Sequence, residues 1–524
     1  MTVSSFDWDD ELPPETGEEV YRALRRALQR KQGFGLFFVQ CSKSQGEAIV
    51  ANLRKDLPQQ QIQELHLEGE VVTLYDQIAD IWQQQPFDVL VLDGLEASLY
   101  AYEDVKRLSG WSSGEIYNYS WKGVPKILNH LNQQREHLRN DFPARFVFLV
   151  PSFVVDYFIQ RAADFLDWRS GLFRFPRDSK EIAVEADRFL ADGGYNQYLK
   201  LMPWERVEKI LTLKAMLQEM GADSERRQCD LLLRLGLLFA VGQDYENAIT
   251  SSEKLLDIKP DLHEAWVARG VALSALGRKE EAVQSYDKAL DINPDYHEAW
   301  YNRGIALSDL GRKEEAIQSY DKAVDINPDY HEAWYNRGVV LSALGRKEEA
   351  VQSYDKALDI NPDYHAWCAR GIALSDLGRK EEAIQSFDKA VDIKPDYHEA
   401  WYNRGVVLSA LGRKEETIQS YDKAVDIKPD LHEAWYNRGR ALSALGRKEE
   451  AIQSFDRSLQ IQPDYANAYY NKACCYGLQE KIDLAIETLQ QAITLDSDCQ
   501  EMAKTDSDFD RIRKDDRFRA LIGE

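Results

Sequence analysis

The chain has 524 residues, of which 44% are hydrophobic and 29% charged, and its formal net charge is -24 at pH 7. Its 12 tryptophans and 26 tyrosines provide the apolar surface of folded domains, which excludes a mainly disordered protein. The acidic balance excludes nucleic acid as the main partner, because contacts with a phosphate backbone require clustered lysine and arginine.

Targeting and membrane segments are not expected. Residues 1–17 carry neither a basic stretch nor an apolar run, so they do not form a signal peptide. The longest apolar run, at 146–159, is broken by Pro151 and Asp156 and is too short to cross a bilayer. The six cysteines show no CxxC spacing, which favours reduced thiols in a cytoplasmic protein over a disulfide framework.

Residues 1–176 are expected to form a first domain of alternating helices and buried strands. In chain order the patterns predict a helix (18–31), a strand (34–40), a helix (46–54), a weak strand (61–67), a helix (72–84), a strand (87–96), a helix (124–139) and a strand (144–151). Continuous apolar strands that alternate with helices predict a parallel sheet covered by helices, which is an α/β fold.

The third predicted strand ends in two acids, Asp93 and Glu96, and the segment 41–48 connects the first strand to the next helix. This order of strand, loop, helix and acid-terminated strand resembles the core of P-loop NTPases of the AAA or STAND (signal-transduction ATPase) type. The resemblance implies that Asp93 and Glu96 occupy the Walker B end, where an acid holds a magnesium-bound water. The alternative for Asp93 is an acid that only caps the strand.

The phosphate-binding loop departs from that family. A phosphate loop needs several glycines, a lysine and a hydroxyl, whereas this chain places Glu47 at the lysine position and Ala48 at the hydroxyl position. A carboxylate about 4 Å from a phosphate charge costs about 4 kcal/mol at an effective dielectric near 20. The expected remnant of the nucleotide loop is Ser42, Lys43, Ser44 and Gly46. We call residues 1–176 the head, and we expect it to be an inactive domain without a cofactor. The alternative is a head that binds ATP and magnesium.

Residues 177–225 are predicted to form a helical connector. The segment 205–220 is a good amphipathic helix, and Gly221 supplies its stop. We expect this helix to pack on the first repeat and to couple the two parts of the chain.

The second half of the sequence is periodic. Prolines recur from Pro260 to Pro463 at intervals of 34 residues, with one interval of 33, and tryptophans and glycines keep the same period. One unit, such as 331–364, has the apolar pattern of a helix, a glycine turn and a second helix that ends before proline. These residues resemble the tetratricopeptide repeat (TPR) family, with eight repeats over 226–498 in an all-α superhelical solenoid. Residues 499–524 are predicted to cap it as a helix.

One departure from the family pattern recurs in the array. An arginine replaces the leucine that precedes the first-helix glycine, and the sequence leaves open whether it extends to solvent or pairs with a repeat aspartate. The arginines are Arg269, Arg303, Arg337, Arg370, Arg404 and Arg438.

The resemblance implies a concave groove, lined by the first helices, that binds a partner peptide or protein. The residues expected to line it are a Tyr–Asn ladder and one arginine: Tyr301, Asn302, Tyr335, Asn336, Tyr402, Asn403, Tyr436, Asn437, Arg440, Tyr470 and Asn471. Tyrosine offers an apolar ring with a polar end, and asparagine can bond to an extended backbone. The alternative is that these pairs are only copied with the repeat. The ladder is interrupted at Cys368, where the fifth repeat also lacks one residue.

These patterns favour a scaffold or signalling adaptor without enzymatic activity. The alternative is a nucleotide-dependent signalling ATPase whose repeats sense a partner. No other catalytic motif is present, and the histidines that recur once in each repeat are too far apart to form a metal site.

Overall fold

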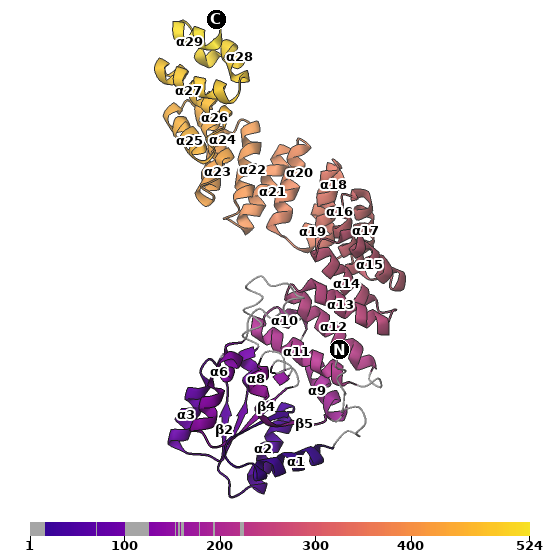
Figure 1. Ribbon diagram of the computed structural model, residues 1–524. Helices are drawn as coiled ribbons and strands as arrows, with labels where there is room; N and C mark the ends of the chain where they lie inside the picture. Colours follow the sequence, from indigo (N-terminus) through magenta and orange to yellow (C-terminus); the bar gives the residue numbers. More distant parts are fainter. Residues whose placement is uncertain are drawn as a thin grey trace, which may run out of the picture. The chain divides into compact units, whose positions relative to one another are not determined.

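The structure is a computed structural model that describes residues 16–69, 71–99, 125–151, 154–155, 158, 162–177, 179–191, 194–220 and 225–524 (Figure 1). The chain forms two compact units, Met1–Ile292 and Asn293–Glu524. The first contains a β-sheet, connecting helices and two helical hairpins, and the second contains only helices.

The sheet of the first unit has five strands in the order β2-β3-β4-β1-β5, and every neighbouring pair is parallel. The strands are β1 Gly35–Gln40, β2 Ile62–His66, β3 Val89–Asp93, β4 Arg145–Val150 and β5 Arg169–Arg174. The four predicted strands are all present, which confirms a parallel sheet with helices.

Helices cover both faces of this sheet (Figure 1). Helices α1 Gly17–Arg30 and α2 Lys43–Asp56 pack on the face that carries Phe37 and Val39 of β1. Helices α3 Leu74–Gln84 and α6 Lys126–Asp141 pack on the opposite face, against Phe38. Successive residues of β1 are apolar because both faces of the strand are buried.

Two predictions in this region were incomplete. Strand β5 was not predicted, because its sequence RSGLFR has arginine at both ends, an internal glycine and only intermediate burial. Helix α2 begins at Lys43 rather than Gly46, because Ser42 and Gln45 form a capping box in which each side chain bonds to the other's backbone amide.

The connector contains α9 Ser179–Ala191, α10 Tyr195–Tyr198 and α11 Pro203–Glu219. As expected, α11 packs against α12 Glu225–Val241, the first helix of the first repeat, and Leu217 joins the apolar cluster around Cys229. The predicted helix stop at Gly221 lies outside the described residues.

Eight helical hairpins follow. They are α12 with α13 Tyr245–Ile258, α14 His263–Ala275 with α15 Lys279–Ile292, α16 His297–Asp309 with α17 Lys313–Ile326, α18 His331–Ala343 with α19 Lys347–Ile360, α20 Tyr364–Asp376 with α21 Lys380–Ile393, α22 His398–Ala410 with α23 Lys414–Ile427, α24 His432–Ala444 with α25 Lys448–Ile461, and α26 Ala466–Leu478 with α27 Ile482–Leu495. The tail forms α28 Asp498–Thr505, a 3-10 turn and α29 Asp516–Ile522, which pack on the last hairpin.

Three features shape the fourth hairpin, and most of the other hairpins share them. A Cβ on Gly338 of α18 would lie 2.6 Å from the ring of Tyr354 on α19, so only glycine allows this approach of the two helices. Gly345 in the turn has a φ of +79°, which a residue with a side chain rarely adopts. The indole nitrogen of Trp334 donates to the carbonyl oxygen of Pro328 at 3.0 Å, which fixes the start of the hairpin.

The recurring arginine links consecutive hairpins. Arg337 Nε donates to Asp321 Oδ1 of the preceding hairpin at 2.6 Å, and Nη1 donates to Ser353 Oγ of its own second helix at 2.6 Å. Equivalent pairs are Arg370–Asp355, Arg404–Asp388 and Arg438–Asp422. The arginine therefore pairs with the aspartate of the repeat before it, which decides between the two alternatives left open by the sequence.

Candidate functional site

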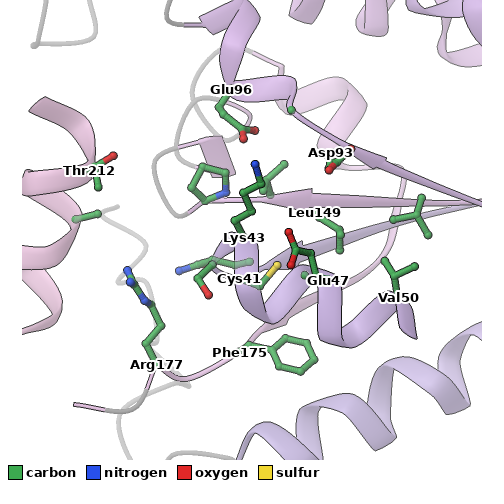
Figure 2. Close-up of a pocket in the computed structure, with 18 of the residues that line it drawn as sticks. Cys41, Lys43, Glu47, Val50, Asp93, Glu96, Leu149, Phe175, Arg177 and Thr212 are labelled. Carbon is green, nitrogen blue, oxygen red and sulfur yellow. The ribbon is translucent and has the colours of Figure 1, made fainter. Parts of the chain in front are cut away.

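A cavity of about 400 Å³ lies at the carboxyl ends of β1, β3 and β4 (Figure 2). The chain leaves β1 into α2 on one face of the sheet, and it leaves β3 towards α6 on the other face. This divergence creates the crevice in which ligands of open α/β sheets are usually bound. Helices α9 and α11 of the connector supply the remaining wall.

Most of the predicted nucleotide-loop and Walker B residues meet at this cavity. Ser42, Lys43 and Gly46 line it from α2, and Asp93 and Glu96 line it from the end of β3. Ser44 is not among the lining residues, and its hydroxyl lies 3.1 Å from that of Ser42.

The segment between β1 and α2, which would have to hold phosphate, is short, and the amides that follow it already make hydrogen bonds within the chain. Only Cys41 and Ser42 separate β1 from α2. The amide of Gln45 donates to Ser42 Oγ at 3.2 Å, and the amide of Gly46 donates to Ser42 O at 2.8 Å. Lys43 and Gly46 therefore belong to the first turn of a capped helix instead of a glycine-rich loop.

Carboxylates dominate the charge of the cavity. The acidic residues that line it are Glu47, Glu64, Asp93, Glu96, Glu185 and Glu208, against Lys43, Arg177 and His66. Three of these acids are paired: Glu64 with Arg54 at 2.5 Å, Asp93 with His66 at 2.9 Å, and Glu185 with Arg177.

The remaining acids, Glu47, Glu96 and Glu208, have no ion pair among the described residues. Glu96 Oε2 is buried and makes no hydrogen bond. Burial raises the pKa of Glu96; a hydrogen bond from its own backbone amide partly offsets this, and the charges of Asp93 and Glu208 raise the pKa further. Burial also raises the pKa of Glu208, an effect that Lys209 and Lys43 partly offset. The cavity therefore repels anions and favours positive charge.

The first helices α16, α18, α20, α22, α24 and α26 form what we call the first-helix face. The members of the Tyr–Asn ladder are half-buried in it, except Tyr470, which is buried. Each of these helices contacts the next one along the array. Asn336 Nδ2 donates to the hydroxyl of Tyr301 at 2.9 Å, and Asn437 bonds in the same way to Tyr402 at 3.3 Å. Asn471 bonds to Tyr436 at 3.3 Å.

These bonds join neighbouring repeats and occupy polar atoms that the sequence analysis assigned to ligand binding. Asn302 lies at the corresponding position of α16. Tyr470 donates instead to Asp506 of the tail at 2.8 Å.

The interruption at the fifth repeat leaves Tyr335 without that bond. No asparagine follows it one repeat later, and the Tyr335 hydroxyl makes no hydrogen bond among the described residues. Cys368 is buried at this position, and burial raises the pKa of its thiol to about 11 although hydrogen bonds with Asn403 and Tyr397 lower it. Among the described residues, Tyr335 is thus the half-buried ladder tyrosine whose hydroxyl makes no hydrogen bond.

Exposed aliphatic side chains form a second feature of the first-helix face. Val339, Ile372 and Val406 occupy the same position in three consecutive repeats, with 39% to 41% of each residue exposed. Arg440 follows at that position in the next repeat and lies over the ring of Tyr436 at 5.8 Å. The sequence analysis missed the three aliphatics, although their recurrence at a position outside the core stripe could have identified them.

One group in the described residues has the proximity needed for a metal ion, namely Cys474, Asp506 and Asp508. Asp506 accepts a hydrogen bond from Tyr470 and another from the amide of Asp508 at 3.0 Å. These bonds give Asp506 a structural role, because it caps the short 3-10 turn in the tail.

Sequence models described as tetratricopeptide repeat match the hairpins, one at residues 267–331, 301–365 and 368–432 and another at 432–465 and 466–499. The hairpins within residues 267–499 are tetratricopeptide repeats. TPR proteins generally serve as scaffolds for protein–protein interaction. No curated protein matches the chain. In the described part of the chain, no helix is both long and apolar enough to cross a membrane.

Several solved structures are similar to the chain. YrrB, a TPR protein with an unusual peptide-binding site, is 25% identical, with 36% of this chain and 98% of YrrB covered and a TM-score of 0.34. MamA is 27% identical, with 30% and 93% covered and a TM-score of 0.29. The C-terminal part of a TPR protein from Cytophaga hutchinsonii is 20% identical, with 46% and 98% covered and a TM-score of 0.41.

Proposed function

We propose that this chain is a cytoplasmic scaffold or adaptor that binds a partner polypeptide in a groove on the first-helix face. The observation that supports the proposal is the row of Val339, Ile372 and Val406, exposed at one repeat position on α18, α20 and α22. Aligned apolar side chains on an otherwise polar helical surface are a feature of interaction sites. Tyrosines beside them add contact area at a low entropic cost.

The charge of the same helices defines the partner further. Exposed acids lie on the same helices. They are Glu332 at the start of α18 and Glu399 at the start of α22, each beside the histidine that precedes it, and Asp376 at the end of α20, which is paired with Lys347. A partner segment that combines aliphatic side chains with lysine or arginine is complementary to this surface. The free hydroxyl of Tyr335 provides one polar contact within the row.

The test replaces Val339, Ile372 and Val406 together by glutamate in the full chain. The matched control replaces Ile360 and Ile393, which end second helices and are 37% and 47% exposed, by glutamate. Proteins retained from the native extract are compared by quantitative mass spectrometry. We expect specific prey to be lost with the triple variant and kept with the control. Equal retention by both variants would move the interface away from the first-helix face.

For the head, we propose an inactive NTPase-like domain. The two-residue connection between β1 and α2 leaves no loop to surround phosphates, and Glu47 stands where a lysine would be required. The unpaired acids Glu96 and Glu208 add further repulsion to an approaching triphosphate.

A nucleotide-dependent switch is the second candidate, favoured by the position of the cavity at the carboxyl ends of a parallel sheet. Its test is binding of labelled ATP with magnesium to the full chain and to the Asp93→Asn variant. Micromolar binding that is lost in the variant would support the switch. Absence of binding to the full chain supports the inactive head.

A further inference from the structure

We propose that the cavity in the head binds a small organic cation, a primary amine or guanidinium compound, held between Glu96 and Glu208. This ligand is independent of the partner polypeptide proposed for the repeats. The cavity is the site, and the chemical class of its ligand follows from the groups that remain unpaired in it.

Glu96 is the first group in the cavity that needs a hydrogen-bond donor from a ligand. Its Oε2 atom is buried without a hydrogen-bond partner, a state that few carboxylates occupy in a folded protein. A donor supplied by a ligand would satisfy this oxygen, and a charged donor would form the stronger bond. Figure 2 shows the carboxylate of Glu96 directed into the cavity.

The second acid stands on a different element. Glu208 belongs to α11, so the two carboxylates reach the cavity from the sheet and from the connector. A guanidinium or an ammonium group with several N–H donors can bond to both acids, which a single-donor ligand cannot do.

Among the described residues that line the cavity, Lys43 is a cation that could satisfy Glu96 from within the chain. Its side chain extends towards Glu96 in Figure 2, yet it forms no hydrogen bond with Oε2, and it is exposed. A single lysine cannot neutralise three acids, since Glu47 lies one turn after it on α2 and Glu208 lies on α11. Lys43 therefore competes with a bound cation.

The size and the walls of the cavity favour an organic molecule over a bare metal ion. About 400 Å³ is within the range of small-molecule sites. Apolar side chains line part of it, among them Val91, Leu149, Phe175 and Leu211. These walls suit the carbon skeleton of an alkyl amine or alkyl guanidine, whereas a divalent ion needs several oxygen ligands within about 2.6 Å.

The experiment measures the melting temperature and the calorimetric affinity of the full chain with agmatine and with spermidine. Tetramethylammonium, which has charge but no N–H donor, is the control ligand, and ATP and magnesium chloride are tested separately. We expect agmatine or spermidine to raise the melting temperature in a concentration-dependent way and tetramethylammonium to leave it unchanged.

Four variants assign the effect to the proposed residues. Glu96→Gln and Glu208→Gln should each weaken the binding of the amine at least about tenfold, because a charged hydrogen bond is lost. Glu18→Gln, whose acid is paired with Arg22 on α1 and does not line the cavity, should leave the affinity unchanged. Lys43→Met should strengthen the binding, because the competing cation is removed.

Several results would overturn the proposal. They are the absence of any amine-dependent shift, equal stabilisation by tetramethylammonium, and an affinity that Glu96→Gln and Glu208→Gln both leave unchanged. Stabilisation by ATP that Lys43→Met abolishes would also overturn it in favour of an anionic ligand. Because the two glutamates lie on separate elements, misfolding of one variant still leaves the other as a test.

Discussion

Removal of the Arg337 side chain tests how the repeats are joined. Arg337→Ala abolishes the bond to Asp321 of the preceding hairpin and the bond to Ser353 of its own, as well as the stacking on Trp334 at 5.8 Å. Ser353 is buried, so its charged hydrogen bond contributes about 1.5 kcal/mol. Asp321 is 44% exposed, so its ion pair adds only about 0.5 kcal/mol. We expect a loss of about 2 kcal/mol.

The control is Arg346→Ala in the same repeat. Arg346 makes a bidentate pair with Glu349 at 2.7 and 2.6 Å, but both side chains are 44% exposed, and the pair joins the N-cap residue of α19 to the first turn of the same helix. Such pairs contribute about 0.3–0.5 kcal/mol. The two variants therefore remove the same residue type and the same kind of ion pair, and they differ in burial and in the elements joined.

Hydrogen exchange suits this test because long repeat arrays do not unfold in two states. A loss of about 2 kcal/mol corresponds to exchange about 30 times faster in amides of α18 and α19, and the control should accelerate exchange about twofold. A double-mutant cycle with Asp321→Asn isolates the pair itself. Equal effects of Arg337→Ala and Arg346→Ala would refute the assignment of a joining role to Arg337.

Three further predictions follow from individual contacts. Gly338→Ala should destabilise the fourth hairpin by about 1–2 kcal/mol in hydrogen exchange of the α18 and α19 amides, because overpacking against Tyr354 exceeds the gain in helix propensity; unchanged exchange would contradict the contact. Gly94→Ala should cost more than about 3 kcal/mol and lower the melting temperature of the head, since its Cβ would lie 2.2 Å from the carbonyl oxygen of Leu67 at a φ of +79°. Glu96→Gln should stabilise the protein more at pH 7 than at pH 4 in thermal melting. The native carboxyl keeps its proton above the ordinary pKa of 4.5 while the unfolded chain loses it, so wild-type stability falls as pH rises through that window. A pH-independent difference would contradict this sign.

The repeats were predictable because their signal is redundant. Period, turn glycine and proline are each repeated along the array, so a single ambiguous unit could not change the outcome. The partner of Arg337 was not predictable in the same way. Each repeat contains several aspartates, and periodicity alone does not distinguish Asp321 from its equivalents in other repeats.

In the head, the sequence contained a local signal for the start of α2, but the order of the elements was given more weight in the prediction. The expectation of a loop at 41–48 came from the order of the elements, although Ser42 and Gln45 have the spacing of a capping box and start a helix. The composition of the cavity was harder to foresee, because Glu208 lies more than a hundred residues after Glu96 and reaches it only through the position of α11. Tertiary contacts of this kind have no periodic trace in a sequence.

The arginine links between hairpins give the array a direction. Each arginine reaches back to the acid of the hairpin before it, so a cut after any hairpin leaves two unequal ends. The C-terminal piece keeps an arginine, 18% exposed in the case of Arg337, without its acid, whereas the N-terminal piece keeps only an aspartate that water hydrates. Removal of hairpins from the C-terminal side of the array should therefore leave the less unfavourable end.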